Sequence, residues 1–135
     1  MKQERPGVGV GVCVRKGGKV LMGKRKGGYE PGAWCFPGGH LEMNEHPETC
    51  AIRETLEETN IEIKNLRFVT FTSDIYRNAR AHYITLFYVA DWKEGAVQLM
   101  EPDKCEEWKW SRWDSLPQPL FTSTRNLIDS GYNPY

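Results

Sequence analysis

The chain has 135 residues, with 18 basic and 18 acidic side chains, and therefore a formal net charge of zero at pH 7. This length predicts one domain over residues 1–135, large enough to bury a core without support from a disulfide or a metal. The neutral balance argues against nucleic acid polymers and membrane surfaces as partners, and no apolar run approaches the ~18 residues that cross a bilayer.

The first predicted element is a strand over residues 8–14. It follows a polar segment, Met1–Pro6, that does not fit a secretory signal. Valines alternate with the glycines of Gly7–Gly11, so the strand has one branched face and one nearly bare face. The bare face leaves room for a bound base or, alternatively, for close backbone packing. It is not a dinucleotide-binding fingerprint, because the glycine spacing differs and the turn Gly17-Gly18 follows instead of a helix.

A returning strand, a loop and a tight turn are predicted next. The strand covers Val20–Gly23, the basic and glycine-rich loop covers Lys24–Gly32, and an extended piece, Trp34–Phe36, leads to Pro37-Gly38-Gly39. Glycine leaves the backbone of such a turn accessible because it has no side chain. A carbonyl oxygen of this turn is therefore a candidate ligand for a cation.

The rest of the chain is predicted to form two helices and three strands. A helix is expected at Pro47–Thr59, because proline suits the first helical turn and Asn60 can end the helix in a left-handed conformation. The further elements expected are strands at Leu66–Tyr76, His82–Asp91 and Glu106–Trp110 and a C-terminal helix at Thr122–Asp129. Strands mixed with two helices predict an α/β domain layered around a sheet.

Three glutamates are clustered on the first predicted helix. Glu54, Glu57 and Glu58 have the spacing i, i+3 and i+4, which places their carboxylates on one face. Ile52 and Leu56 are expected to point the opposite way, toward the sheet, with the acidic face turned from the core. Such a face is either solvated surface or a site for Mg²⁺, which takes about six oxygen ligands from carboxylates, water and substrate phosphates.

Residues 39–61 resemble the Nudix box, the signature of the Nudix hydrolases. The box is a Gly, five residues, a Glu, seven residues, Arg-Glu, an aliphatic residue, any residue, Glu-Glu, any residue, a Gly and an aliphatic residue. Every charged position is matched, while Thr55 takes an aliphatic place and Asn60 replaces the last glycine. The resemblance implies the Nudix fold, an α/β/α sandwich with a mixed sheet between the Nudix-box helix and a C-terminal helix. It also implies Mg²⁺-dependent hydrolysis of a diphosphate bond, with Mn²⁺ as a possible substitute.

The resemblance implies a role for each charged position of the box. The implied metal ligands are Glu54, Glu58, Glu57 and the carbonyl oxygen of Gly39. Glu57 is a further ligand or the base that orients water, and the implied catalytic residues are Glu57, Glu54 and Arg53. Arg53 is expected to orient a glutamate through a charge-assisted hydrogen bond, and Glu45 to be a supporting acid.

Similarity beyond the box points to a MutT-like branch of this family. The similar segments are Arg5–Val14, Leu21–Lys26, Phe36–Glu42 and Glu101–Phe121. This branch includes a human diphosphatase of thioguanine nucleotides and a plant cytosolic Nudix hydrolase. The resemblance implies a homodimer that converts (d)NTPs, including oxidised or modified guanine nucleotides, to monophosphate and pyrophosphate. A nucleotide sugar or a prenyl diphosphate as substrate and, as a different class, a non-catalytic nucleotide sensor are the alternatives.

The same resemblance implies a set of substrate-binding residues. They are Arg25, Gly38, Gly39, Thr85, Phe121, Thr122 and Ser123. Arg25 matches an arginine that reaches phosphates, although a solvated loop charge is the alternative. Phe121 stacks on a base or belongs to the core. Thr122 stands where relatives carry tryptophan, which weakens the expectation of guanine as the base.

The remaining cysteines, tryptophans and glutamates of interest are expected to have structural or secondary roles. Four scattered cysteines, Cys13, Cys35, Cys50 and Cys105, lack paired zinc-ligand spacing and are expected to be buried free thiols in a reducing cytoplasm. Three tryptophans, Trp108, Trp110 and Trp113, are expected to pack the sheet against the last helix. Glu101 and Glu106 are predicted surface residues, with a late acid or base role as the alternative.

Overall fold

The computed structural model describes residues 4–135, so the first three residues of the predicted domain and of the segment Met1–Pro6 lie outside it. In the described part the strands are β1 (Gly7–Lys16), β2 (Lys19–Arg25), β3 (Trp34–Cys35), β4 (Gly38–His40), β5 (Glu62–Tyr76), β6 (Ala81–Glu94) and β7 (Cys105–Arg112). The helices are α1 (Pro47–Thr59) and α2 (Thr122–Asp129), and short 3-10 turns cover Arg77–Ala79 and Trp113–Ser115. No helix of the described residues is both long and apolar enough to cross a membrane.

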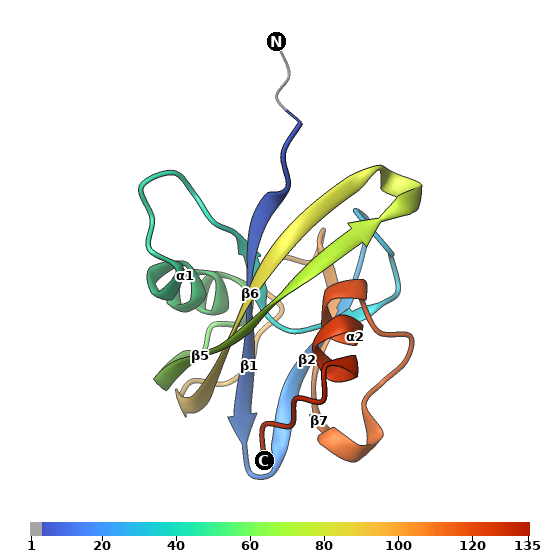
Figure 1. Cartoon of the computed structure of the whole chain (residues 1–135). Coiled ribbons are helices and arrows are strands. Elements are labelled where there is room, and N and C mark those ends of the chain that lie inside the picture. Colours follow the sequence, from blue (N-terminus) through green and yellow to red (C-terminus); the bar gives the residue numbers. More distant parts are fainter. Residues whose placement is uncertain (1–3) are drawn as a thin grey trace.

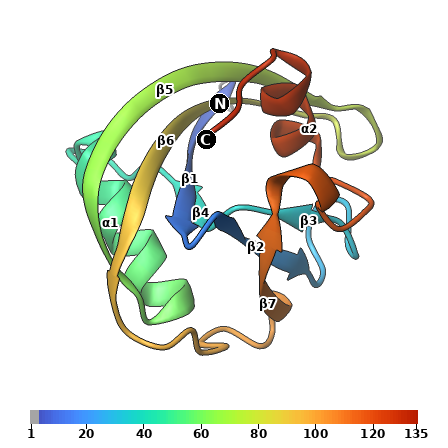
Figure 2. The ribbon, with the colours of Figure 1, turned by 90° about the horizontal axis from the view of Figure 1, so that it is seen from below.

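The strands form one mixed sheet in the order β3-β2-β1-β6-β5, with β4 paired to β1 and β7 paired to β2. Only β1 and β6 run parallel among these pairs. β1 pairs with β2 at the hairpin end, Arg15–Val20 and Lys16–Lys19, and with β4 at its opposite half. The strands β1 and β2 therefore diverge toward the β4 end, and β4 fills part of the opening. Figure 1 shows this divergence, and Figure 2 shows the strong curvature of β5 and β6 around it.

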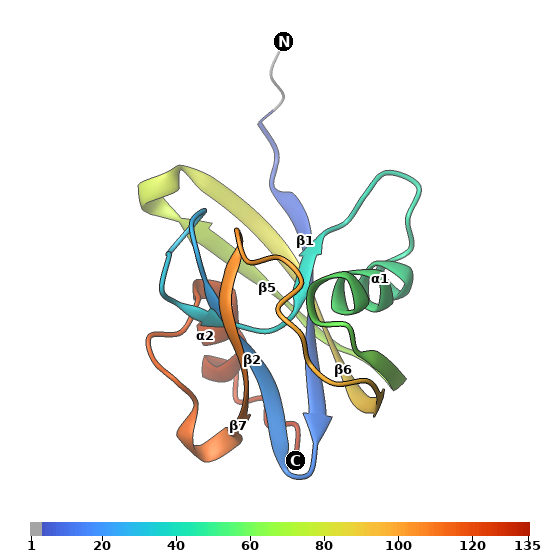
Figure 3. The same ribbon diagram turned by 180° about the vertical axis from the view of Figure 1, so that it is seen from behind.

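The two helices cover opposite faces of the sheet, which confirms the predicted α/β/α sandwich (Figures 1 and 3). Val10, Val12 and Val14 of β1 join the core beneath α1, while Cys13 joins the core beneath α2 with Leu127. The alternation expected for the first strand is therefore real. Each face of β1 packs into a different core, because successive side chains of a strand point to opposite sides.

The bare face of β1 provides close packing at two glycines and open space at a third. A methyl group built on Gly7 would lie 2.5 Å from the ring of Tyr83, and one on Gly11 would lie 2.7 Å from the ring of Phe87. These two glycines are needed for close packing. At Gly9 the nearest atom would be 3.7 Å away, which is an ordinary contact, so this position stays open.

Helix α1 has the predicted bounds, and Asn60 ends it with φ 64° and ψ 22°, in the left-handed region as predicted. The prediction for its buried face is wrong, because Ile52 is 51% and Leu56 45% exposed. The buried residues are small ones, Cys50, Ala51, Thr55 and Thr59. Small side chains let the helix approach the sheet closely, and the Thr55 hydroxyl is satisfied by donating to the carbonyl oxygen of Ala51 at 2.8 Å. The acidic face consequently borders β4 instead of facing away from the sheet.

The expectation for the tryptophans is correct for one of the three. Trp113 stacks on Phe36 at 6.4 Å between ring centres, in the core beneath α2. Trp108 and Trp110 pack against the core beneath α1, on the opposite side. They are two residues apart on β7, so they share one face of that strand, whereas Trp113 lies beyond its end.

Candidate active site

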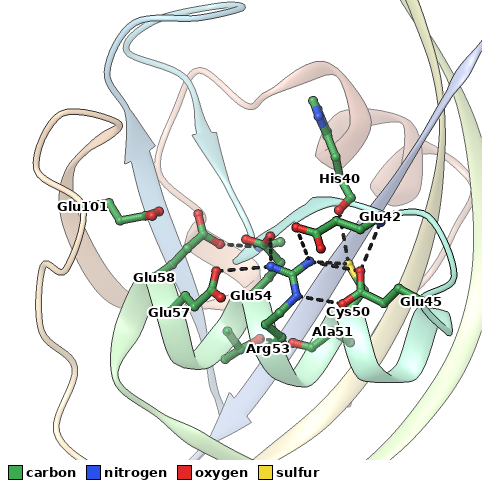
Figure 4. Close-up of polar contacts among 12 residues, drawn as sticks. His40, Glu42, Glu45, Cys50, Ala51, Arg53, Glu54, Glu57, Glu58 and Glu101 are labelled. Carbon is green, nitrogen blue, oxygen red and sulfur yellow. Dashed lines mark hydrogen bonds and ion pairs between the residues drawn. The ribbon is translucent and has the colours of Figure 1, made fainter.

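Arg53 is the centre of the polar network on α1 (Figure 4). Its Nε and Nη2 donate to the two carboxylate oxygens of Glu45, at 2.7 and 3.0 Å. Its Nη1 donates to Glu54 at 2.8 Å and to Glu57 at 3.2 Å. One planar guanidinium group therefore fixes three carboxylates through four hydrogen bonds, a task that a lysine ammonium cannot perform with the same geometry.

Glu45 belongs to the supporting layer of the site. The hydrogen bond from Arg53 is the main cause that lowers the pKa of Glu45 to about 2. Its carboxylate also accepts the backbone N–H of Glu42 at 3.1 Å, which anchors the loop before α1. Glu45 is thus held ionised, and it ties the loop to the arginine that orients the other glutamates.

Glu54 and Glu58 lie on successive turns of α1 and meet β4. Glu58 accepts the backbone N–H of Gly38 at 2.8 Å, and a methyl group on Gly39 would lie 2.4 Å from the Cδ of Glu54. Burial is the main cause that raises the pKa of Glu58 to about 8, and burial also raises the pKa of Glu54. The tight turn predicted at Pro37-Gly38-Gly39 is wrong, because Gly38 and Gly39 lie in strand β4, where they pair with β1. From this strand they contact the two predicted ligands, and both carboxylates lie where positive charge would be favourable.

Glu101 approaches the same site from the loop between β6 and β7, and Figure 4 shows it directed toward Glu58. Its negative charge contributes to the raised pKa of both Glu54 and Glu58. Glu106 lies elsewhere, paired with Lys24 at 3.3 Å. The sequence predicts surface positions for both glutamates, with a late acid or base role as the alternative, because no spacing pattern connects a loop residue to a helix more than 40 positions earlier.

The polar groups line a cavity of about 480 Å³, called here the carboxylate compartment. Its charged lining comes from Arg25, Lys24, Lys26, Glu42, Glu54, Glu58, Glu101 and Lys104, beside Gly38, Gly39 and His40. Cations and carboxylates thus face one space. Lysine and arginine suit phosphate oxygens, while carboxylates suit a hard cation.

The oxygen ligands of this site fit Mg²⁺, provided that the substrate and water complete the coordination shell of the metal. Within residues 4–135, no three carboxylate, imidazole or thiol side chains converge closely enough for a metal site made by protein alone. Mg²⁺ usually binds through one or two carboxylates, with waters and substrate phosphates in the other positions. Glu54 and Glu58, with pKa values raised by burial, and the adjoining backbone of Gly39 meet that description.

A second cavity, of about 460 Å³, adjoins the first and is called here the aromatic compartment. Its aromatic lining is Tyr29, Phe36, His40, Tyr76, Tyr83, Phe87 and Phe121. The two compartments share Arg25, Gly28, Cys35, Gly38, Gly39, His40 and Glu58, so they form one continuous cleft. Gly9 also lines the aromatic compartment, in agreement with its open position on β1.

Most residues predicted to bind substrate line this cleft. The Arg25 guanidinium lies 4.1 Å from the centre of the Phe121 ring, and its Nε donates to the carbonyl oxygen of Tyr29 at 2.8 Å. Arg25 is therefore a positioned side chain between the compartments and not a free loop charge. Thr85 and Ser123 line the aromatic compartment as well.

Thr122 is placed outside the lining of the aromatic compartment. Its backbone N–H and its hydroxyl both donate to the Glu30 carboxylate, at 2.8 and 2.7 Å, so it attaches the glycine-rich loop to the start of α2. Tyr29, Tyr76 and Thr124 line the cavity, although no sequence pattern predicts a binding role for them. Tyr83 was also missed, although its spacing of two from Thr85 on one strand would have placed it on the same face.

The four cysteines are free thiols. Burial raises the pKa of Cys13, Cys35 and Cys50 to about 12 and that of Cys105 to about 11. A thiol with so high a pKa has little thiolate at neutral pH and is a poor nucleophile. The four cysteines are therefore poorly suited to act as nucleophiles.

The fold agrees with comparisons to known proteins. The model of the NUDIX domain matches residues 4–130. The chain is 31% identical over 120 residues to the NAD-capped RNA hydrolase NudC of Edwardsiella ictaluri, covering 87% of this chain but only 44% of that protein. It is 30% identical over 126 residues to the ADP-ribose pyrophosphatase of Methanocaldococcus jannaschii, covering 92% of this chain and 72% of that protein. The crystal structure of a MutT NUDIX hydrolase from Burkholderia pseudomallei superposes with a TM-score of 0.88 at 32% identity, covering 93% of this chain and 98% of that one.

Proposed function

The chain belongs to the Nudix family of hydrolases, and from that premise we propose that it is a Mg²⁺-dependent nucleoside triphosphate pyrophosphohydrolase. The proposed reaction converts a (d)NTP and water to a (d)NMP and pyrophosphate. Oxidised or otherwise modified nucleotides belong to the proposed substrate range.

The observation that carries this proposal is the single cleft with two compartments. The aromatic compartment, about 460 Å³, offers flat rings against which a base can stack. The carboxylate compartment continues from it and holds the cations and carboxylates that a triphosphate and its metal require. A nucleoside triphosphate has the same order of parts, with the base at one end and the phosphates at the other.

Five charged residues have a defined task in the proposed reaction. Mg²⁺ bound by Glu54, Glu58 and the Gly39 backbone would neutralise phosphate oxygens and acidify a bound water. Arg25 binds phosphate oxygens from the junction of the two compartments. Glu57 or Glu54 accepts the proton of the attacking water while Arg53 holds the carboxylate in place. The oxygen of the attacking water forms a bond to one phosphorus of the bridge between the α- and β-phosphates as the bond from that phosphorus to the bridging oxygen breaks. The bridging oxygen leaves with that electron pair on the other product, which gives monophosphate and pyrophosphate.

A second substrate class is favoured by one of the relatives. The archaeal relative named ADP-ribose pyrophosphatase is 30% identical, and this chain covers 72% of its length. The chain spans less than half of the NudC relatives, so the activity of those longer proteins is weaker support. ADP-ribose, a nucleotide sugar or a prenyl diphosphate would use the same carboxylates but place a different group in the aromatic compartment.

We also propose that the enzyme is a homodimer that works in the cytoplasm. The support for the dimer is the family resemblance together with an apolar surface on the edge strand β5. Phe68, Phe71 and Ile75 of this strand are 54%, 60% and 51% exposed. Light scattering should return the mass of two chains, and Phe71→Glu should return the mass of one.

A substrate panel tests the proposed function directly. The purified protein with Mg²⁺ is given the natural NTPs and dNTPs, 8-oxo-dGTP, ADP-ribose, a nucleotide sugar and a prenyl diphosphate. Monophosphate with pyrophosphate from one or more triphosphates is the expected result. Turnover of the other diphosphates alone would overturn the substrate class, and tight binding without any turnover would favour a nucleotide sensor.

Glu58→Gln is the matched test of the catalytic assignment, with Glu107→Gln on the exposed face of β7 as its control. Both changes replace a carboxyl group by an amide of nearly the same shape. Loss of a metal ligand should lower turnover by at least ~100-fold, whereas the control should keep it. Chelation with EDTA should stop turnover and added Mg²⁺ should restore it. Full activity of Glu58→Gln would show that the metal site lies elsewhere.

A further inference from the structure

Asp74 is a fully buried carboxylate that lies behind the aromatic compartment and does not line it. Its Oδ2 accepts the hydroxyl hydrogen of Thr85 at 2.5 Å, and its Oδ1 accepts from the Asn126 amide at 3.0 Å. Asn126 lies on α2, so this carboxylate joins β5, β6 and α2. A buried carboxylate is costly unless it is well bonded, and an apolar residue would fill the space at lower cost.

The contact with Asp74 determines what Thr85 can offer a ligand. A threonine hydroxyl has one hydrogen and two lone pairs, and a carboxylate can only accept. Because Asp74 takes the hydrogen, the Thr85 oxygen has only lone pairs left for the compartment. Gly9 lies beside this oxygen, with 3.7 Å between the oxygen and the position of a methyl group, so no side chain of β1 covers it.

We propose that Asp74 is a specificity-determining residue that makes Thr85 an obligate hydrogen-bond acceptor, so that the compartment selects a base edge carrying an N–H donor. The inference rests on the proposed function in one respect, the placing of a nucleobase in the aromatic compartment. Asp74 itself is a positioning residue, because it acts on the ligand only through Thr85.

Two further features of the compartment support a polar recognition of the base. Thr124 also lines it, and its buried hydroxyl has no hydrogen-bond partner among residues 4–135. Tyr76 lines it too, stacked on Tyr29 at 5.1 Å between ring centres. Burial and then the charge of Asp74 raise the pKa of Tyr76, so its phenol keeps its hydrogen at neutral pH. The wall thus combines flat rings with a few placed hydroxyls, as small-molecule sites do.

The test compares the dissociation constants of paired nucleoside monophosphates. The members of each pair differ in one hydrogen-bond donor of the base, either an amino group or a ring N–H. The pairs are AMP with purine riboside monophosphate, GMP with IMP, and GMP with 1-methyl-GMP. Binding of monophosphates needs no turnover, so this result is independent of whether the protein hydrolyses triphosphates. The parent protein should discriminate at least one pair by about tenfold, as expected when a buried acceptor loses its donor.

Asp74→Asn reverses the direction of the hydrogen bond between residue 74 and Thr85 while nearly preserving the shape of the side chain. The asparagine amide donates to Thr85, so the hydroxyl hydrogen turns into the compartment and opposes an N–H group. The ratio of the two dissociation constants within a pair should fall to about two or less. Thr85→Val should abolish the discrimination too, and Asp74→Asn should add nothing in that background. Thr85→Ser keeps the hydroxyl and should keep the discrimination.

Asp129→Asn on the exposed end of α2 is the control for the change of charge and should bind as the parent does. Circular dichroism establishes that each variant is folded. If Asp74→Asn does not fold, Thr85→Val against Thr85→Ser decides the question. Equal discrimination in parent and folded Asp74→Asn or Thr85→Val would overturn the inference, as would a parent that discriminates none of the three pairs.

Discussion

Gly38 and Gly39 are neighbours in β4, yet alanine at each position should cause a different defect. A methyl group at Gly38 would lie 2.0 Å from the carbonyl oxygen of Val10, which belongs to the backbone of the central strand β1. A methyl group at Gly39 would lie 2.4 Å from the Cδ of Glu54. The backbone of a central strand cannot move at low cost, whereas the end of a glutamate can rotate away.

The expected magnitudes follow from these distances. Glu54 must retreat by about 1 Å to reach an ordinary contact, and a misplacement of that size costs about 100-fold in rate at a catalytic site. Gly39→Ala should therefore lose about 100-fold in kcat/KM, with a Tm within about 3 °C of the parent. Gly38→Ala overpacks rigid backbone and should lose about 2 kcal/mol of unfolding free energy. For a chain of this size that loss lowers Tm by about 8 °C.

The assay pairs thermal unfolding by circular dichroism with steady-state turnover of the best substrate from the panel. Mn²⁺ affinity by paramagnetic resonance gives a second measure of the Glu54 position. Gly9→Ala, whose methyl group meets nothing closer than 3.7 Å, controls for the substitution itself and should keep the parental Tm. The reasoning fails if Gly39→Ala keeps full turnover and metal affinity, or if it unfolds as readily as Gly38→Ala.

Three further outcomes are expected. Arg53→Lys loses the contact in which two arginine nitrogens bind the Glu45 carboxylate. It should lower kcat/KM by about 10- to 100-fold without unfolding the protein, as steady-state kinetics and a melting curve would reveal. Leu56→Ser should change the unfolding free energy by less than about 0.5 kcal/mol in a urea titration, because this side chain is 45% exposed. Hydrogen bonding from Asn65 is the main cause that lowers the pKa of Asp91, and Arg15 adds to it. A lowered pKa contributes stability above the unfolded value of 3.8 and loses it as pH falls further, so Asp91→Asn should unfold with less acid dependence below about pH 4 in a pH titration.

Local sequence determined helix α1 and the chemistry it carries. Pro47 and Asn60 set its two ends, and the spacing of Glu54, Glu57 and Glu58 put three carboxylates on one side of it. These features depend on bonds and contacts within about four residues, so they are visible in the order of residues alone. The Nudix signature, which is likewise contiguous, could be read for the same reason.

Tertiary structure decided which face of α1 is buried and which distant residues complete the cleft. Ile52 and Leu56 are exposed because small residues allow the helix to pack close to the sheet, a choice that depends on the partner surface. Glu101 reaches the carboxylates from a distant loop, and Asp74 on β5 reaches Thr85 on the adjacent strand β6. The curvature and the register of the strands bring these groups together. No pattern along the chain specifies the curvature or the register, because both depend on how separate segments pack against one another.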